Sequence, residues 1–140
     1  MKIVLRGIAV VFALLLLLGI AQWVASESGE VVVLTTTDAE GAPHETRLWV
    51  VEHQGSAWLR AGGEVQAWYG RLVARPDVEV ERGGQRSAYR AVPQPEAQQV
   101  VNDLMREKYG WADDFISLLF GRDDAVAIRL DPPGAAGGTP

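Results

Sequence analysis

Residues 7–25 form one apolar run, GIAVVFALLLLLGIAQWVA, in which Gln22 is the single polar side chain. As a helix, this run would be about 28 Å long, close to the hydrocarbon thickness of a lipid bilayer. Lys2 and Arg6 precede the run, and the first acidic residue of the chain, Glu27, follows it. The positive-inside rule therefore predicts an extracytoplasmic domain after the helix, with the cytoplasmic side as the alternative.

The same run also fits a cleaved secretory signal, because residues 24–26 are small enough to precede a cleavage site. Trp23 is too bulky to suit such a site, whereas it suits an interfacial aromatic anchor. We therefore expect residues 1–26 to be an uncleaved single-pass anchor that contacts the lipid bilayer through residues 7–25. A signal peptide is the alternative, and a buried core helix is disfavoured because the run has no polar face.

The composition of the chain excludes several classes of function. Its 140 residues suit one domain, and they include no Cys, which excludes disulfides and thiolate zinc sites. His44 and His53 are the only histidines, so we expect no metal site. The net charge of −5 becomes −7 after residue 26, because Lys2 and Arg6 lie before it. An acidic domain is not expected to bind nucleic acid.

Short β-branched or alternating segments dominate the rest of the chain. Residues 31–37 read VVVLTTT, and residues 78–82 alternate Val and Glu before a Gly-Gly turn. The predicted strands span residues 31–37, 47–52, 56–61, 78–82, 85–91 and 125–130. Their close spacing leaves no room for parallel crossovers and favours a small antiparallel barrel.

Three segments have helical periodicity, at residues 64–74, 96–109 and 111–120. The predicted class is therefore α+β: a six-stranded antiparallel barrel over residues 27–131, with one inserted helix and a C-terminal helix pair, preceded by a transmembrane helix. Residues 132–140 are small, uncharged and rich in Pro and Gly, so we expect a disordered tail.

Catalytic signatures are absent from the sequence: it contains no nucleophile elbow, Walker loop or dinucleotide fingerprint. No residue is therefore assigned a catalytic role. Asp113 and Asp114 fall in the predicted first turn of a helix, where the helix dipole favours negative charge. This interpretation is preferred to a paired-carboxylate site.

A Gly-Gly pair at residues 62–63 joins a predicted strand to a predicted helix. Free backbone N–H groups at such a junction can bind an anion or the carbonyl edge of a flat ring. Trp68 and Tyr69 follow one turn later, and Arg47 lies on the neighbouring strand. The alternative is a simple turn followed by two core aromatic residues.

The order of these elements resembles the split β-barrel flavin- and deazaflavin-dependent oxidoreductases, which share a fold with the pyridoxamine phosphate oxidases. It is most similar to the nitroreductase and quinone reductase-like branch that uses coenzyme F420. The resemblance covers roughly residues 31–131. The segments that carry it are LTTT (34–37), RLWVV (47–51), WLRAGG (58–63), WY (68–69), LVARPD (72–77) and VEVE (78–81).

The resemblance implies a split barrel and an oxidoreductase that binds F420, or FMN instead, and passes a hydride to a quinone or nitro-type acceptor. Together with the anchor expected from residues 7–25, it predicts a membrane-anchored oxidoreductase. It also implies a homodimer. The cofactor-binding residues that it implies are Thr37, Gly41, Thr46 and Arg47 for the phosphate tail, Arg60, Ala61, Gly62 and Gly63 for the ring, and Trp68 and Tyr69 for the wall. Tyr109 and Trp111 would border the substrate.

The first turn departs from the family pattern. Residues 38–41 read Asp-Ala-Glu-Gly, where the family usually has a basic, glycine-rich turn. Two acids beside a phosphate would repel it, which favours a cofactor with a shorter anionic tail, such as FMN. A cofactor-free barrel that binds a small ligand or a partner at the membrane is the second alternative.

Overall fold

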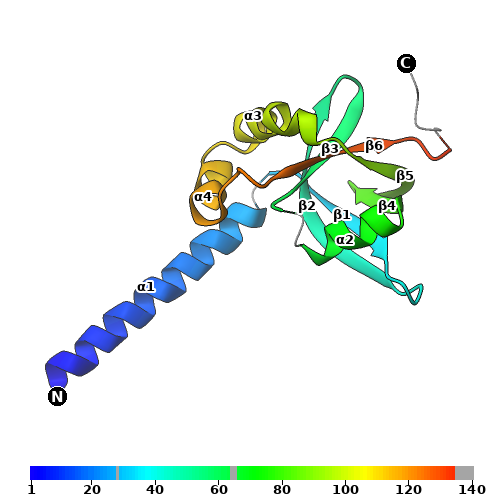
Figure 1. Ribbon diagram of the computed structural model, residues 1–140. Coiled ribbons are helices and arrows are strands. Elements are labelled where there is room, and N and C mark those ends of the chain that lie inside the picture. Colours follow the sequence, from blue (N-terminus) through cyan, green and yellow to red (C-terminus); the bar gives the residue numbers. More distant parts are fainter. Residues whose placement is uncertain (28, 64–65, 135–140) are drawn as a thin grey trace.

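Six antiparallel strands close into a barrel in the order β1-β2-β3-β6-β5-β4 (Figure 1). This computed structural model describes residues 1–27, 29–63 and 66–134, with the side chains of residues 25–27 outside the description. The strands are β1 (Val31–Thr37), β2 (Pro43–His53), β3 (Ser56–Ala61), β4 (Asp77–Arg82), β5 (Gln85–Pro93) and β6 (Val126–Asp131). The predicted α+β class and antiparallel barrel are confirmed.

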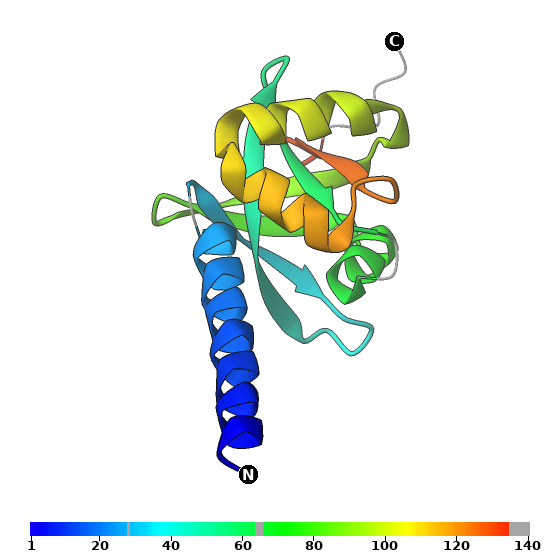
Figure 2. The same cartoon turned by 90° about the vertical axis from the view of Figure 1, so that its left-hand side faces the viewer.

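The helices are α1 (Lys2–Glu27), α2 (Ala67–Ala74), α3 (Gln98–Tyr109) and α4 (Trp111–Phe120), with a 3₁₀ turn at Pro95–Ala97. Figure 2 shows α3 and α4 stacked over one side of the barrel and α2 apart from them. The inserted helix and the C-terminal helix pair are therefore present as predicted.

Two predicted boundaries differ from the structure by three residues or more. β2 begins at Pro43 rather than at residue 47, because its polar first residues pair with β1 as far as Thr37. α2 begins at Ala67 rather than at residue 64, and residues 64–65 lie outside the described part. The disorder expected for the tail concerns mainly residues 135–140, which also lie outside it.

Two apolar cores stabilise the domain. The barrel interior holds Val32, Leu34, Leu59, Leu72 and Ile128, all with no exposed surface. A second core lies between the barrel wall and α3, and its members are Val51, Trp58, Val101, Met105, Tyr109 and Ala127. The second core fixes α3, and therefore the start of α4, against β2, β3 and β6.

Helix α1 projects away from the barrel (Figure 1). Its segment Lys2–Val24 has a mean hydropathy of 2.8 and is long and apolar enough to cross a membrane, a test that a signal sequence also passes. Residues 1–20 are exposed, whereas Ala21 and Gln22 are half-buried. α1 packs against α4, and these two half-buried residues lie near its C-terminal end.

A polar cluster fastens the chain between α1 and β1 to the barrel. The Glu30 carboxylate accepts hydrogen bonds from Arg82 at 2.7 and 2.9 Å and from Lys108 at 2.7 Å. The Tyr109 hydroxyl donates to the Glu30 carbonyl at 2.6 Å. Hydrogen bonds from Arg82 and Lys108 lower the pKa of Glu30 to about 2. Glu30, just before β1, is therefore tied to β4 and α3.

Candidate functional site

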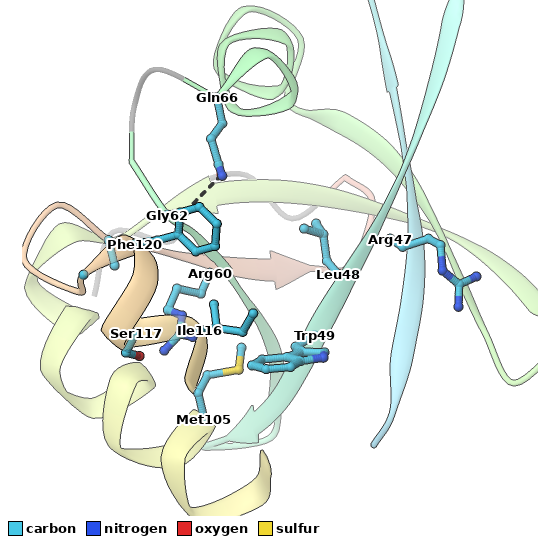
Figure 3. Close-up of a pocket in the computed structure, with 12 residues that line it drawn as sticks. Arg47, Leu48, Trp49, Arg60, Gly62, Gln66, Met105, Ile116, Ser117 and Phe120 are labelled. Carbon is cyan, nitrogen blue, oxygen red and sulfur yellow. Dashed lines mark hydrogen bonds between the residues drawn. The ribbon is translucent and has the colours of Figure 1, made fainter. Parts of the chain in front are cut away.

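A pocket of about 290 Å³ opens between β2, the end of β3 and α4 (Figure 3). Its apolar walls are aromatic and aliphatic side chains from three elements, which suits a flat ring. Polar groups occur on the β3 side and on α4. The lining residues are Arg47, Leu48, Trp49, Arg60, Gly62, Gln66, Met105, Ile116, Ser117, Phe120, Gly121 and Ala125.

Three of the residues predicted for cofactor binding, Arg47, Arg60 and Gly62, line this pocket. Figure 3 shows the Arg60 side chain among the other labelled side chains. The Arg47 side chain points away from them, because Leu48, its neighbour on β2, takes the inward-facing position of the strand.

The other predicted site residues lie elsewhere. Trp68 and Tyr69 pack into the barrel core with Ala61, their rings 6.5 Å apart and edge to face. Thr37, Gly41 and Thr46 belong to the β1–β2 hairpin and its turn, and Gly63 follows the pocket residue Gly62; none of the four is in the pocket lining.

Of the two residues predicted for the substrate, neither lines the pocket. Trp111 is 61% exposed on α4. Tyr109 is buried behind Trp49, with the two rings stacked at 4.4 Å. Because Trp49 does line the pocket, Tyr109 supports the pocket wall from behind. Trp49 itself was not singled out as a site residue, although it stands in the RLWVV motif.

An ion-pair cluster joins β3 to α4 beside the pocket. Asp113 has no exposed surface, and its two carboxylate oxygens accept hydrogen bonds from Arg60 and Arg122. Arg60 also donates to Asn102 of α3 at 3.2 Å. The predicted first-turn position of Asp113 is confirmed, but the helix dipole is only part of its environment. Its main partners are two guanidinium groups, which sequence spacing did not indicate.

Two polar groups of the pocket, a hydroxyl and a backbone N–H, bear on how it would bind a ligand. The Ser117 hydroxyl is buried and, within the described part of the chain, has no hydrogen-bond partner. A buried hydroxyl without a partner is destabilising unless a ligand satisfies it. The Gly62 N–H donates to Oε1 of Gln66 at 3.0 Å. A side-chain amide carbonyl therefore occupies the position in which a ring carbonyl would accept the same bond.

Hydrogen-bond donors and two arginines offset the negative charge of the acidic first turn, residues 38–41. The Asp38 carboxylate accepts hydrogen bonds from His44 and from the backbone of Ala42 and Glu40, and these bonds lower the pKa of Asp38. Two cations reach the same hairpin from α2 and its C-cap: Arg71 donates to Thr36 at 2.9 Å, and Arg75 donates to the Ala39 carbonyl at 3.1 Å. Sequence reasoning missed both arginines, because they lie 35 and 36 residues from their partners.

Solved structures of similar fold come from several proteins. The structure of an F420-H2-dependent reductase (FDR-A) is 25% identical, covers 71% of this chain and 92% of its own, and has a TM-score of 0.55. HutZ, a heme storage protein from Vibrio cholerae, is 20% identical, covers 79% of this chain and 87% of its own, and has a TM-score of 0.58. Rv2991, a conserved hypothetical protein from Mycobacterium tuberculosis, is 21% identical, covers 82% and 79%, and has a TM-score of 0.56.

A comparison with curated proteins found no match. The family model described as F420H(2)-dependent quinone reductase matches residues 21–113, which is more than half of the chain. That match includes β1 to β5, the inserted helix α2, and α3. This chain belongs to the F420H2-dependent quinone reductase family.

Proposed function

We propose that this protein is a membrane-anchored, deazaflavin-dependent reductase that delivers a hydride from reduced F420 to a quinone. Family membership is the observation that carries the proposal. When bound, the coenzyme would supply the hydride, so the protein needs no nucleophile or metal of its own. Among the described residues, no group of three or more His, Cys, Asp or Glu side chains could hold a metal ion.

The pocket supports binding of the ring of such a coenzyme. Trp49, Met105 and Phe120 provide apolar and aromatic surface for the faces of the ring. Arg60, the Gly62 N–H and the Ser117 hydroxyl provide donors for its carbonyl edge. The volume of about 290 Å³ lies at the lower end of the range of known ligand pockets, so it suits the ring alone and leaves the tail outside.

The phosphate tail would then follow the β1–β2 hairpin, as the family resemblance implies. Arg71 and Arg75 approach this hairpin from α2 and its C-cap. They supply the positive charge that the Asp38–Glu40 turn lacks, and hydrogen bonds already engage the Asp38 carboxylate. This arrangement supports F420 as the cofactor, with FMN as the competing ligand to test.

The apolar helix supports the membrane part of the proposal. Lys2–Val24 is 23 residues long, or about 34 Å as a helix, and none of its most apolar window is buried in the protein. Such a helix would hold the pocket close to the bilayer that contains lipophilic quinones. A cleaved signal is the competing outcome, and the N-terminal sequence of the mature protein distinguishes the two.

The decisive experiment is a fluorescence titration of the full chain in lipid nanodiscs with F420 and, separately, with FMN. Trp49 lines the pocket, so saturable quenching of tryptophan emission is expected with F420, and a Trp49→Phe variant should lose much of that quenching. Reduced F420 should then reduce a short-chain quinone. Absence of saturable binding by F420 would overturn the proposal, and binding of FMN alone would replace the cofactor.

Two variants test the proposed contacts of the phosphate tail and of the ring separately. Arg75→Ala should weaken binding of F420 roughly tenfold or more, since charge-assisted contacts to phosphate are strong, yet leave a tail-less deazaflavin unaffected. Gln66→Ala should tighten binding of both ligands severalfold, because the Gly62 N–H is then available without displacement of the amide. Arg90→Ala, at a salt bridge on β5, is the matched control for loss of an exposed arginine.

A further inference from the structure

Helix α4 carries four apolar side chains that the barrel leaves exposed, three of them in its last turn. We define the α4 face as Trp111, Leu118, Leu119 and Phe120, whose exposed fractions are 61%, 83%, 40% and 66%. Outside α1, Val73 and Val100 are the only other large apolar side chains exposed to this degree in the described residues. A concentration of apolar side chains on one helix indicates an interaction surface.

The position of α4 identifies what this surface contacts. In Figure 1, α4 lies beside the C-terminal turns of α1, while the strands lie beyond the end of that helix. The two helices pack against each other, and the half-buried Ala21 and Gln22 lie near the end of the apolar segment Lys2–Val24. With α1 across a bilayer, α4 would therefore lie at the depth of the membrane interface.

The acidic side chains of α4 form ion pairs with arginines, which suits a position beside the apolar part of a bilayer. Asp113 is buried between Arg60 and Arg122, and Asp114 pairs with Arg106 and Arg122. The acidic groups of α4 are thus each matched by arginine. Exposed aliphatic side chains together with aromatic ones, here Trp111 and Phe120, are the pattern of a segment that lies in the membrane interface.

The same helix also forms one wall of the pocket. Ile116, Ser117 and Phe120 line the pocket, and Phe120 belongs to the α4 face as well. Figure 3 shows Phe120 and Ile116 on the α4 side, facing Trp49 and Leu48 of β2. A surface in contact with lipid would therefore adjoin the mouth of the pocket.

We propose that the α4 face rests in the lipid bilayer beside α1, so that the pocket receives its apolar acceptor directly from the membrane. The membrane contact requires that α1 is retained as an anchor. The access route rests on the proposed function, because it concerns the quinone. The two parts are tested by separate measurements.

Membrane contact is measured by depth-dependent fluorescence quenching of the full chain in phosphatidylcholine nanodiscs. The chain has no Cys, so Leu118→Cys gives a single labelling site on the α4 face. Ala88→Cys on β5 is the matched control, because Ala88 is exposed and β5 lies on the side of the barrel away from α4 (Figure 1). Brominated lipids should quench a fluorophore at position 118 several times more strongly than one at position 88.

Equal, weak quenching at the two positions would overturn the membrane contact. Quenching at position 118 that appears only at a high ratio of protein to lipid would also overturn it, because a second copy of the chain would then cover the face. These readouts need neither cofactor nor turnover. They therefore remain informative if the proposed reductase activity is absent.

The access route is measured with Leu118→Glu, which changes an exposed side chain outside the pocket lining. KM for a long-chain quinone embedded in the nanodisc should rise about tenfold, while kcat/KM for a short-chain, water-soluble quinone stays unchanged. An equal effect on both quinones would overturn the access route. Reduction of neither quinone by the unaltered chain would contradict the proposed function instead.

Discussion

Arg60 of β3 and Asp113 of α4 lie 53 residues apart in the sequence and form a buried ion pair beside the pocket. The second carboxylate oxygen of Asp113 is bound by Arg122, and the second terminal nitrogen of Arg60 donates to Asn102. Desolvation of such a carboxylate is costly, so it is tolerated only while both oxygens are paired. The pair therefore fixes the wall of the pocket that α4 provides.

Replacement of Asp113 by Asn should destabilise the protein strongly. The substitution leaves two arginines without their anion, and breaking a buried pair in this way costs roughly 3–5 kcal/mol. The free energy of unfolding, measured in urea by near-UV circular dichroism, checks the effect. Asp114→Asn is the control, because that side chain is 62% exposed and should change stability by less than about 1 kcal/mol. Equal effects of the two substitutions would refute the special role of Asp113.

Ser117→Ala should weaken binding of F420 without destabilising the protein. Its hydroxyl is buried without a partner, so its removal should leave the free energy of unfolding unchanged or raise it by about 1 kcal/mol. Affinity for F420 should fall roughly threefold to tenfold, since the ring loses a hydrogen bond worth about 1 kcal/mol. Thermal unfolding and the fluorescence titration measure the two effects. A destabilised variant would show that the hydroxyl has a partner within the protein.

Tyr109→Phe should lower the free energy of unfolding, because the hydroxyl that holds this ring behind Trp49 is lost. The Tyr109 hydroxyl accepts a hydrogen bond from the Val50 N–H at 3.0 Å and donates to the Glu30 carbonyl. Loss of the hydroxyl leaves buried backbone groups unpaired, at a cost of about 1–3 kcal/mol. Tyr89→Phe, on β5, should change stability by less than about 0.5 kcal/mol.

The ionisation of Tyr109 offers an independent spectroscopic check. Burial raises the pKa of Tyr109 to about 12. The difference in phenolate absorbance between the unaltered chain and Tyr109→Phe should therefore appear only near pH 12. A difference that develops near pH 10 would mean that the hydroxyl is accessible to water.

The Glu30 cluster should make stability depend on pH in the acid range. Its folded pKa of about 2 lies below the ordinary value of 4.5, so its stabilising effect is complete above pH 4.5 and is lost as the pH falls towards 2. Glu30 is about one-third exposed, so solvent screening limits the effect to about 1 kcal/mol. The stability difference between the unaltered chain and Glu30→Gln should shrink over this interval. A constant difference would exclude the ionised carboxylate as its source.

Strands and helices could be predicted because their patterns are local. Residues 78–81 alternate Val and Glu, and both Val side chains are buried while neither Glu is, and Pro95 begins the turn that leads into α3. The polar start of β2 at Pro43 was missed, because those residues lie on an exposed hairpin whose only strand signal is pairing with β1. Tertiary pairing decided that boundary.

The pocket was predictable only in part. The β3 end, with Arg60 and Gly62, could be placed through the family motif, and both residues line the pocket. The α4 wall, with Ile116 and Phe120, could not be placed, because the angle at which that helix returns to the barrel depends on Asp113 and its distant partners. Contacts between residues so far apart have no signature in the spacing of a single sequence.

The order in which the barrel closes also constrains how the protein is made. β6 (Val126–Asp131) pairs with both β3 and β5, so the ring of strands stays open until the chain beyond α4 has left the ribosome. By then α1 has long been synthesised, because it stands at the start of the chain. During that interval the edges of β3 and β5 that β6 will cover are unpaired and can associate with other chains. Loss of β6 should therefore yield an aggregating polypeptide instead of a smaller working domain.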